Sequence, residues 1–237
     1  MKRPFVALFA TALLAAASVT QAASFVAGKH SSILPQAQRT NVAPGKVEVM
    51  EVFSYGCPAC NHFRPSMKKL KAALPANAQL VYLPASWNSA ENWPLFQRAF
   101  ITAQSLGVAD KAHDAMFEAI WTTGELGIMD GQRIKTRLPS IEDTARFYQR
   151  VAGVKAETFV NASKSFSVDL KMRQADTQIT AMQVPSTPTL VVAGKYRINN
   201  EAFTNQDEII DLVKFLVAKE SPAATPAATA TAPAKKS

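Results

Sequence analysis

Two cysteines three positions apart are the residues of this sequence best suited to carry out chemistry. Cys57 and Cys60 are the only cysteines among 237 residues, and Pro58 and Ala59 separate them. A pair at this spacing can form and break a disulfide across a two-residue spacer. The thiolate, and not the thiol, is the nucleophile, so the pair is reactive where one sulfur is easily ionised. We therefore interpret the pair as a redox centre.

A predicted strand and a predicted helix position the two cysteines. Residues 46–53 read as a strand, and the apolar residues after the pair recur at the spacing of a helix face: Phe63, Met67, Leu70 and Leu74. The unpaired N–H groups and the positive end of such a helix favour a negative sulfur on Cys57. Pro58 suits the first helical turn, where its missing N–H leaves no bond unmade, and it stiffens the spacer.

The cysteine pair could also be a structural disulfide, part of a zinc site, or two unrelated thiols. A structural disulfide across so short a loop would constrain the unfolded chain little, since the entropic gain grows with loop length. A structural zinc site usually has four Cys or His ligands, and only His30, His62 and His113 could join the pair. Two unrelated buried thiols would rarely fall at this spacing. The redox interpretation is favoured over all three.

The two ends of the chain differ in composition from the rest. Residues 1–23 combine a basic start, an apolar run and small residues before a cleavage point, which is the pattern of a secretory signal peptide. We expect the mature protein in an oxidising compartment, where structural thiols are rare outside disulfides. The formal net charge of +8 includes two basic residues in the signal peptide and two at the C-terminus. No basic cluster with interleaved aromatic residues is present, which argues against nucleic acid as a partner.

Glu51 is the exception in an otherwise apolar strand. It shares a strand face with Val47, Val49 and Phe53, and it stands six residues before Cys57. One interpretation is a carboxylate at a strand end that reaches water. The functional alternative is a semi-buried carboxylate beneath the cysteines that relays protons.

The remaining patterns predict a strand, a run of helices and then a return to strands. Residues 78–83 read as a second strand that ends at Pro84. Apolar periodicity, supported in one case by a capping pattern, then predicts four helices, a hairpin and a last helix capped by Thr204 and Asp207. The predicted helices and strands are residues 91–106, 111–123, 140–153, 167–183, 189–193, 196–198 and 204–218.

These elements predict an α/β fold with a helical insertion. Residues 46–88 and 184–220 form one sheet-containing domain that is discontinuous in sequence, and residues 89–183 form the inserted helical domain. Residues 24–45 are expected to be an extended arm. Residues 221–237 contain Ala, Pro and Thr with no large apolar residue, which predicts a disordered tail.

Two motifs together resemble the DsbA family of thiol–disulfide oxidoreductases. They are Glu51-Val52-Phe53-Ser54-Tyr55-Gly56-Cys57-Pro58-Ala59-Cys60 and Ser186-Thr187-Pro188-Thr189-Leu190-Val191-Val192, with the helical insertion between them. The resemblance covers residues 47–217. It implies a thioredoxin fold with an inserted helical domain, and a location in the bacterial periplasm.

The resemblance assigns roles by position. It implies that Cys57 is the exposed nucleophile, that Cys60 is the buried resolving cysteine, and that Glu51 is a buried acid. Pro188 would be a cis-proline facing the cysteines, and the backbone of Thr187 would pair with substrate. These assignments are expectations.

The spacer between the cysteines departs from the family pattern. Members commonly have His where this chain has Ala59, so Pro58 and Ala59 are the residues expected to tune the redox strength. A methyl group cannot stabilise the Cys57 thiolate as a positive charge or a donor would. We therefore expect a higher Cys57 pKa, and a less oxidising protein, than in a relative that carries His.

The function that the resemblance implies is the introduction of disulfide bonds into unfolded secreted polypeptides. A quinone-linked, DsbB-like membrane partner would reoxidise the protein, and the redox-active disulfide would need no cofactor or metal. Isomerases of this kind usually have a dimerisation domain, for which little room is present, and this argues against an isomerase. A monomer is expected. A disulfide reductase or isomerase, a glutathione S-transferase-like isomerase and a peptide-binding chaperone with a structural disulfide remain alternatives.

Overall fold

The computed structural model describes residues 25–221. The predicted signal peptide, and the predicted tail except Ser221, lie outside the described residues. Among the helices of residues 25–221, none is both long and apolar enough to cross a membrane.

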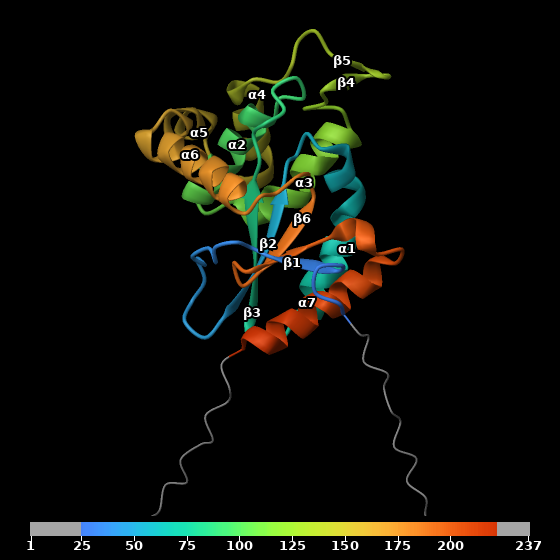
Figure 1. The fold of residues 1–237 in the computed structure, drawn as a ribbon. Coiled ribbons are helices and arrows are strands. Elements are labelled where there is room, and N and C mark those ends of the chain that lie inside the picture. Colours follow the sequence, from blue (N-terminus) through green and yellow to red (C-terminus); the bar gives the residue numbers. More distant parts are fainter. Residues whose placement is uncertain (1–24, 222–237) are drawn as a thin grey trace, which may run out of the picture.

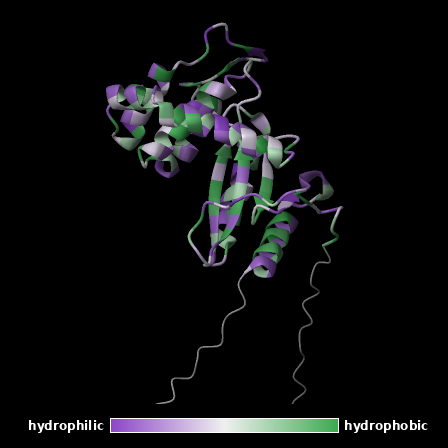
Figure 2. Cartoon of the chain, turned by 60° about the vertical axis from the view of Figure 1, so that its left-hand side comes forward, coloured by the Kyte–Doolittle hydropathy of each residue, from purple (hydrophilic) through white to green (hydrophobic). Residues whose placement is uncertain are grey.

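A mixed five-stranded sheet forms the centre of the molecule (Figure 1). Its strands β2 and β3 pair in parallel, and the other neighbours are antiparallel. Every residue of β2 is buried, so both of its faces are covered, as the sequence predicted. Figure 2 shows the strands as mostly hydrophobic. In spatial order the strands are β1 (Ser31–Ile33), β7 (Tyr196–Ile198), β6 (Thr189–Val192), β2 (Val47–Phe53) and β3 (Ala78–Pro84).

Two helices from distant parts of the sequence pack on one face of this sheet (Figure 1). They are α1 (Pro58–Ala73) and α7 (Gln206–Glu220). Apolar side chains of both helices and of β2 and β6 form a single buried cluster. This packing fixes the direction of α1, and therefore the place where its N-terminus meets the end of β2.

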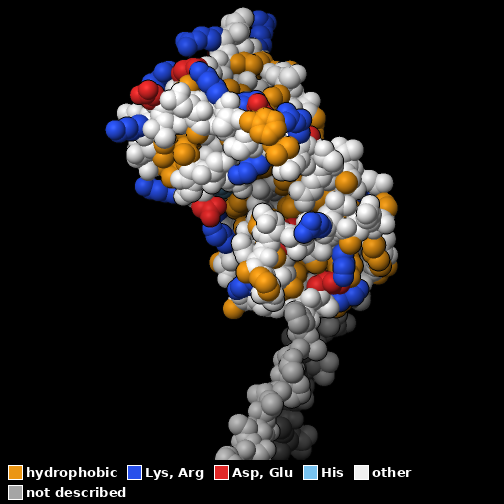
Figure 3. Space-filling model, turned by 90° about the vertical axis from the view of Figure 1, so that its left-hand side faces the viewer, with side chains coloured by type: hydrophobic (Ala, Val, Ile, Leu, Met, Phe, Trp, Pro, Cys, Tyr) orange, Lys and Arg blue, Asp and Glu red, His pale blue; other side chains and the backbone are white. Residues whose placement is uncertain are grey.

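The inserted block contains five helices and lies beyond the end of β2 that leads to the cysteines (Figure 1). Its core is rich in aromatic residues and is continuous with Phe53 and Tyr55 near the cysteines. Figure 3 shows Lys and Arg side chains scattered over this block, without a single basic patch on that face. The helices are α2 (Trp93–Ser105), α3 (Ala109–Trp121), α4 (Ile141–Ala152), α5 (Ala156–Ser163) and α6 (Phe166–Ala181).

The caps explain where several helices begin and end. Ser140 and Asp143 form a reciprocal capping box at the start of α4, and Gly153 ends the helix with a φ of 79°. These three positions confirm the sequence prediction. The last helix was predicted with the wrong cap: Asn205, and not Thr204 with Asp207, accepts a hydrogen bond from the Asp207 backbone at the start of α7.

Several elements went unpredicted because they are short. Strand β1 lies in the segment expected to be an extended arm, and it pairs with β7. Helix α5 has eight residues, and the small hairpin of β4 (Met129–Asp130) and β5 (Arg133–Ile134) has two residues a strand. A turn of 3-10 helix, η1 (Asn200–Ala202), follows β7. None of these is long enough to show a clear hydrophobic period.

Candidate active site

Cys57 caps the N-terminus of α1. Its Sγ accepts a hydrogen bond from the Cys60 backbone N–H at 3.3 Å, and Pro58 occupies the first helical turn. A sulfur at this position meets the orphan N–H groups and the positive end of the helix, which stabilise a thiolate. The predicted placement of the pair between strand and helix is therefore confirmed.

Gly56 allows the chain to turn from β2 into α1. A Cβ on Gly56 would lie 2.6 Å from the Glu91 carbonyl oxygen and 2.7 Å from Trp93 Cδ1. These distances are far below van der Waals contact, so a larger residue would move the loop. The start of the inserted block therefore packs directly against the residue before Cys57.

Both cysteines are buried, although Cys57 was expected to be exposed. The exposed fraction is 4% for Cys57 and 1% for Cys60, whereas the spacer residues Pro58 and Ala59 are exposed. The reason is the loop before β6, which lies over the first sulfur. The Thr187–Pro188 peptide bond is cis, as predicted, and Cys57 Sγ lies 3.5 Å from the Thr187 carbonyl oxygen.

The two cysteines are not joined by a disulfide in the structure, and their environments shift the two pKa values in opposite directions. A hydrogen bond from the Cys60 thiol, with further contributions from Thr187 and from backbone N–H groups, lowers the pKa of Cys57 to about 6. Burial, the adjacent Cys57 and the charge of Glu51 raise the pKa of Cys60 far above its ordinary value. Cys57 therefore ionises first and Cys60 stays protonated.

Thr187 contributes both its backbone and its side chain to this site. Thr187 is 9% exposed, and its hydroxyl oxygen has no hydrogen-bond partner within residues 25–221. The side chain of Thr187 is also one of the groups that lower the pKa of Cys57. The hydroxyl is therefore available to donate to a Cys57 thiolate.

Glu51 lies beneath the two cysteines and is 3% exposed. Desolvation, followed by the charge of Cys57, raises the pKa of Glu51 to about 8. Of the two interpretations offered by the sequence, the buried acid is confirmed and the solvated strand end is wrong. The carboxyl is mostly protonated at neutral pH and can exchange a proton near that pH.

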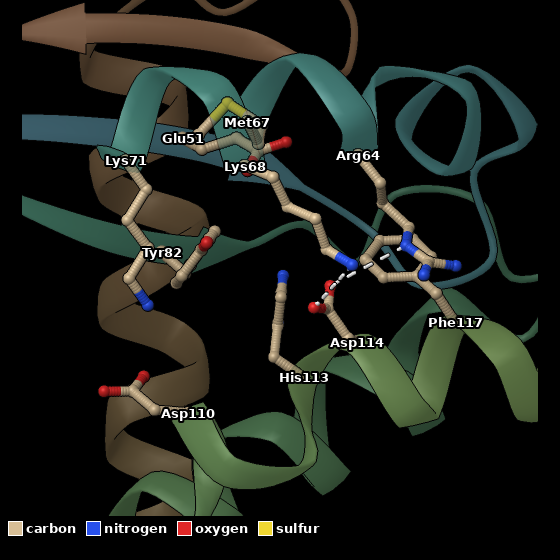
Figure 4. A pocket seen from close by; sticks show the side chains of 10 residues that line it. All are labelled: Glu51, Arg64, Met67, Lys68, Lys71, Tyr82, Asp110, His113, Asp114 and Phe117. Carbon is tan, nitrogen blue, oxygen red and sulfur yellow. Dashed lines mark ion pairs between the residues drawn. The ribbon is translucent and has the colours of Figure 1, made fainter. Parts of the chain in front are cut away.

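A cavity of about 70 Å³ connects Glu51 with charged side chains at the surface (Figure 4). This volume can hold a few water molecules. Figure 4 shows Lys68, Arg64 and Asp114 at one side of the cavity; Asp114 pairs with Lys68 at 3.1 Å and with Arg64 at 3.8 Å. Glu51 therefore has a polar connection away from the disulfide.

His113 and Tyr82 complete the surroundings of Glu51, and sequence reasoning missed their role. Tyr82 is the β3 residue in register with Glu51, and its ring lies 4.2 Å from that of His113, centroid to centroid. His113 Nδ1 lies 3.0 Å from the Tyr55 hydroxyl. Desolvation lowers the pKa of His113 to about 4, so the imidazole is neutral. The sequence offered one signal that His113 is buried: it lies one turn before Met116 and Phe117, on the apolar face of α3.

This arrangement suits exchange between a disulfide and thiols. One sulfur is a stabilised thiolate, the other is a buried thiol, and a buried acid with a raised pKa lies next to them. Within the part of the chain that the structure describes, no group of three His, Cys, Asp or Glu residues is arranged to hold a metal ion.

Comparisons with known proteins agree on one family. A family model described as thioredoxin matches residues 43–212. The thiol:disulfide interchange protein DsbA of Pseudomonas aeruginosa is 35% identical over 225 residues, which cover 92% of this chain and 98% of the relative.

Solved structures give the same result. The oxidoreductase DsbA from Xylella fastidiosa has a TM-score of 0.71 at 28% identity, with 82% of this chain and 97% of that chain covered. Proteus mirabilis DsbA, solved with a non-covalently bound peptide, has a TM-score of 0.65 at 24% identity, with 83% and 100% covered. The expected thioredoxin fold with a helical insertion is confirmed.

Proposed function

The chain belongs to the DsbA family of thiol:disulfide interchange proteins, and from this premise we propose the roles of its residues. The protein is a protein disulfide oxidoreductase that introduces disulfide bonds. We propose that exchange proceeds through a disulfide between Cys57 and Cys60. The observation that carries this proposal is the placement of the pair: Cys57 caps the N-terminus of α1 beside the cis Thr187–Pro188 loop, and Cys60 is buried one turn further along the helix.

The reaction begins when a substrate thiolate attacks Cys57 Sγ in the Cys57–Cys60 disulfide. The bond between the two cysteines breaks, a mixed disulfide forms at Cys57, and Cys60 leaves with the electron pair and takes up a proton. A second substrate thiolate then attacks the substrate sulfur of the mixed disulfide, and Cys57 leaves as a thiolate. The substrate loses two electrons and two protons. The protein gains both electrons and one proton, which is on Cys60, while Cys57 remains a thiolate and the second proton goes to solvent. A low pKa makes Cys57 a good leaving group and stabilises the reduced protein.

We assign Glu51 the proton transfers at Cys60. Its raised pKa, its burial and its cavity support this role, because a group with a pKa near the working pH exchanges protons best. In the reverse direction, when Cys60 attacks a mixed disulfide, Glu51 accepts the thiol proton. The cavity in Figure 4 gives that proton a polar route toward solvent.

The substrates that we propose are unfolded secreted polypeptides with free thiols. The Thr187–Pro188 loop lies beside the reacting sulfur, which supports pairing of an extended substrate segment with the Thr187 backbone, as an added strand. We further propose export to the periplasm, reoxidation by a quinone-linked membrane partner, action as a monomer, and no cofactor apart from the disulfide itself.

The experiment that tests this proposal is a single turnover with a reduced dithiol peptide. Oxidised protein should convert the peptide to its disulfide in a one-to-one ratio, with equal loss of the Cys57–Cys60 bond, as measured by mass spectrometry after acid quench and alkylation. Measurement of the reduction potential of the pair then places the protein among oxidants or reductants. If the peptide stays reduced and the Cys57–Cys60 disulfide stays intact, the proposal is contradicted and the disulfide has a structural role.

A further inference from the structure

A polar pocket lies beside the Thr187–Pro188 loop. Its volume is about 390 Å³, and Pro188 forms part of its lining. The other walls come from the arm before β1, from β7 and from η1, which the sequence did not connect with the active site. We call this hollow the polar pocket; its charged lining residues are Lys29, Arg197 and Glu201.

Hydrogen bonds hold the walls of the polar pocket against the substrate loop. The Asn200 side-chain amide donates to the Pro188 carbonyl at 2.9 Å, which ties η1 to the loop. The Asn199 side-chain amide donates to the Lys29 carbonyl at 2.9 Å, and this bond ties the arm to the end of β7. The pocket is therefore built into the loop that faces Cys57.

Two cations line the polar pocket without a carboxylate partner. Lys29 is exposed and Arg197 is half-buried, and within residues 25–221 neither lies within 4.0 Å of an acidic oxygen. Arg197 Nη1 donates to the backbone carbonyls of Met182 and Gln183, which hold the guanidinium in place. No hydrogen bond from its Nε or Nη2 is found in the described part of the chain. A guanidinium with donors to spare binds carboxylates well.

We propose that the polar pocket binds an acidic side chain of the polypeptide substrate and so makes Lys29 and Arg197 specificity-determining residues. This inference rests on the proposed function. Pro188 lines the pocket and is adjacent to Thr187, so a segment that pairs with the Thr187 backbone would run close to the pocket. Side chains of an extended segment alternate between two faces, so only residues of one parity relative to the reacting cysteine reach the cations. Glu201 opposes an incoming carboxylate, and it leaves the pocket with one net positive charge.

The test uses reduced synthetic peptides with two cysteines that differ at one position near the first cysteine. That position carries Glu, Gln or Lys and is moved residue by residue along the flanking segment. The measured quantity is the second-order rate constant for reduction of the Cys57–Cys60 disulfide in a single turnover. Each rate constant is divided by that of the same peptide with a small aromatic disulfide, which removes the effect of the charge on the peptide's own thiol.

We expect the normalised rate constant for the best-placed Glu to exceed that for Lys about fivefold at low salt, since exposed ion pairs contribute modestly. The ratio should fall toward one in about 1 M salt, because salt screens exposed charges. It should also fall in Lys29→Met and Arg197→Met, and it should increase in Glu201→Gln. Arg197→Lys keeps the charge if the methionine variant disturbs the loop, and Lys164→Met on the far helical block is the matched control.

Three results would overturn the inference. One is a ratio of one at every peptide position in the unaltered protein, and another is an unchanged ratio in both methionine variants. A third is an equal loss of the ratio in Lys164→Met. If the peptides are oxidised rapidly but without discrimination, only the pocket assignment fails. If no peptide is oxidised, the proposed function itself fails.

Discussion

The surroundings of Cys57, which we call the rim, stabilise a negative charge on sulfur. The surroundings of Cys60, which we call the interior, destabilise it. At the rim, hydrogen bonds from the Cys60 thiol, from the Thr187 side chain and from helix N–H groups lower the pKa of Cys57 to about 6. In the interior, burial and the charge of Glu51 keep Cys60 protonated. The two sulfurs are three residues apart, so the difference comes from one helical turn of displacement into the core. An asymmetric pair of this kind has a defined attacking and leaving order.

The largest expected effect comes from removal of each sulfur in turn. Cys57→Ser should reduce exchange by more than about a thousandfold, because the reacting sulfur is lost. Cys60→Ser should instead accumulate mixed disulfides at Cys57, since the resolving thiol is absent. Non-reducing electrophoresis and mass spectrometry identify the trapped species. If the Cys60 variant traps nothing while the Cys57 variant still turns over, Cys60 is the attacking cysteine and the roles of the two cysteines have been exchanged.

Glu51→Gln tests whether the interior supplies the proton transfers. We expect resolution of a mixed disulfide by Cys60 to slow about tenfold to a hundredfold, which is within the range of general base catalysis. In the unaltered protein the rate should rise with pH as Glu51 ionises near its pKa of about 8. The variant should lack that inflection. Glu48→Gln is a matched control, because Glu48 is 2% exposed on the same strand but lies on the opposite face; equal rates in all three proteins would remove Glu51 from the mechanism.

The same substitution should change how stability depends on pH. The pKa of Glu51 is raised from 4.5 to about 8 on folding, so between these values the folded protein binds the proton that the unfolded chain has released. The contribution of Glu51 to the free energy of unfolding should therefore be highest below pH 4.5 and decrease as pH rises through 8. Glu51→Gln should remove this decrease and be more stable than the unaltered protein at pH 8, by on the order of a few kcal/mol. Urea unfolding at about pH 5 and about pH 8 measures the difference, and a parallel loss of stability in both proteins would contradict a buried carboxyl.

Ala59→His should increase the difference between the pKa values of Cys57 and Cys60 by lowering that of Cys57. Ala59 is exposed in the spacer, so an imidazolium there would face the thiolate at little desolvation cost. We expect the pKa of Cys57 to fall by about one further unit, and the reduction potential to rise by about 30 mV for each unit. Thiolate absorbance at varied pH gives the first quantity and a glutathione equilibrium the second. Ala59→Phe adds a ring without charge and should shift neither.

Of these substitutions, Thr187→Val should have the smallest effect on the pKa of Cys57. It removes a hydroxyl that has no hydrogen-bond partner within residues 25–221 and leaves the backbone unchanged. Loss of one donor to the thiolate should raise the pKa of Cys57 by about half a unit. Thr189→Val is the control, since the Thr189 hydroxyl donates to the Ser186 carbonyl at 2.7 Å and not to sulfur. An unchanged pKa in the Thr187 variant would assign the stabilisation to the Cys60 thiol and the helix N–H groups.

Much of the candidate site was predictable because its chemistry is local in sequence. The strand, Gly56, the cysteine pair and the helix form a continuous stretch, so the capping of α1 by Cys57 follows from residue types and spacing. The buried acid at Glu51 was one of two interpretations. Alternation along the strand predicts on which face of the sheet Glu51 lies, but not whether other elements cover it there. His113 was missed, because its position on a helix face did not reveal that Tyr82 and Glu51 lie against that face. The polar pocket was missed because the arm and η1 have no sequence signal that links them.

The sequence by itself determined the redox pair and the order of the longer helices and strands, and its resemblance to the DsbA family implied the loop that faces the cysteines. These depend on short-range periodicity, caps and motif spacing, which act within a few residues. Only the tertiary structure decided that Cys57 is covered, that Glu51 has a pKa near neutrality, and that Lys29 and Arg197 lie beside the Thr187–Pro188 loop. Burial and electrostatic environment depend on chain segments that are far apart in sequence, and packing against the sheet brings those segments together.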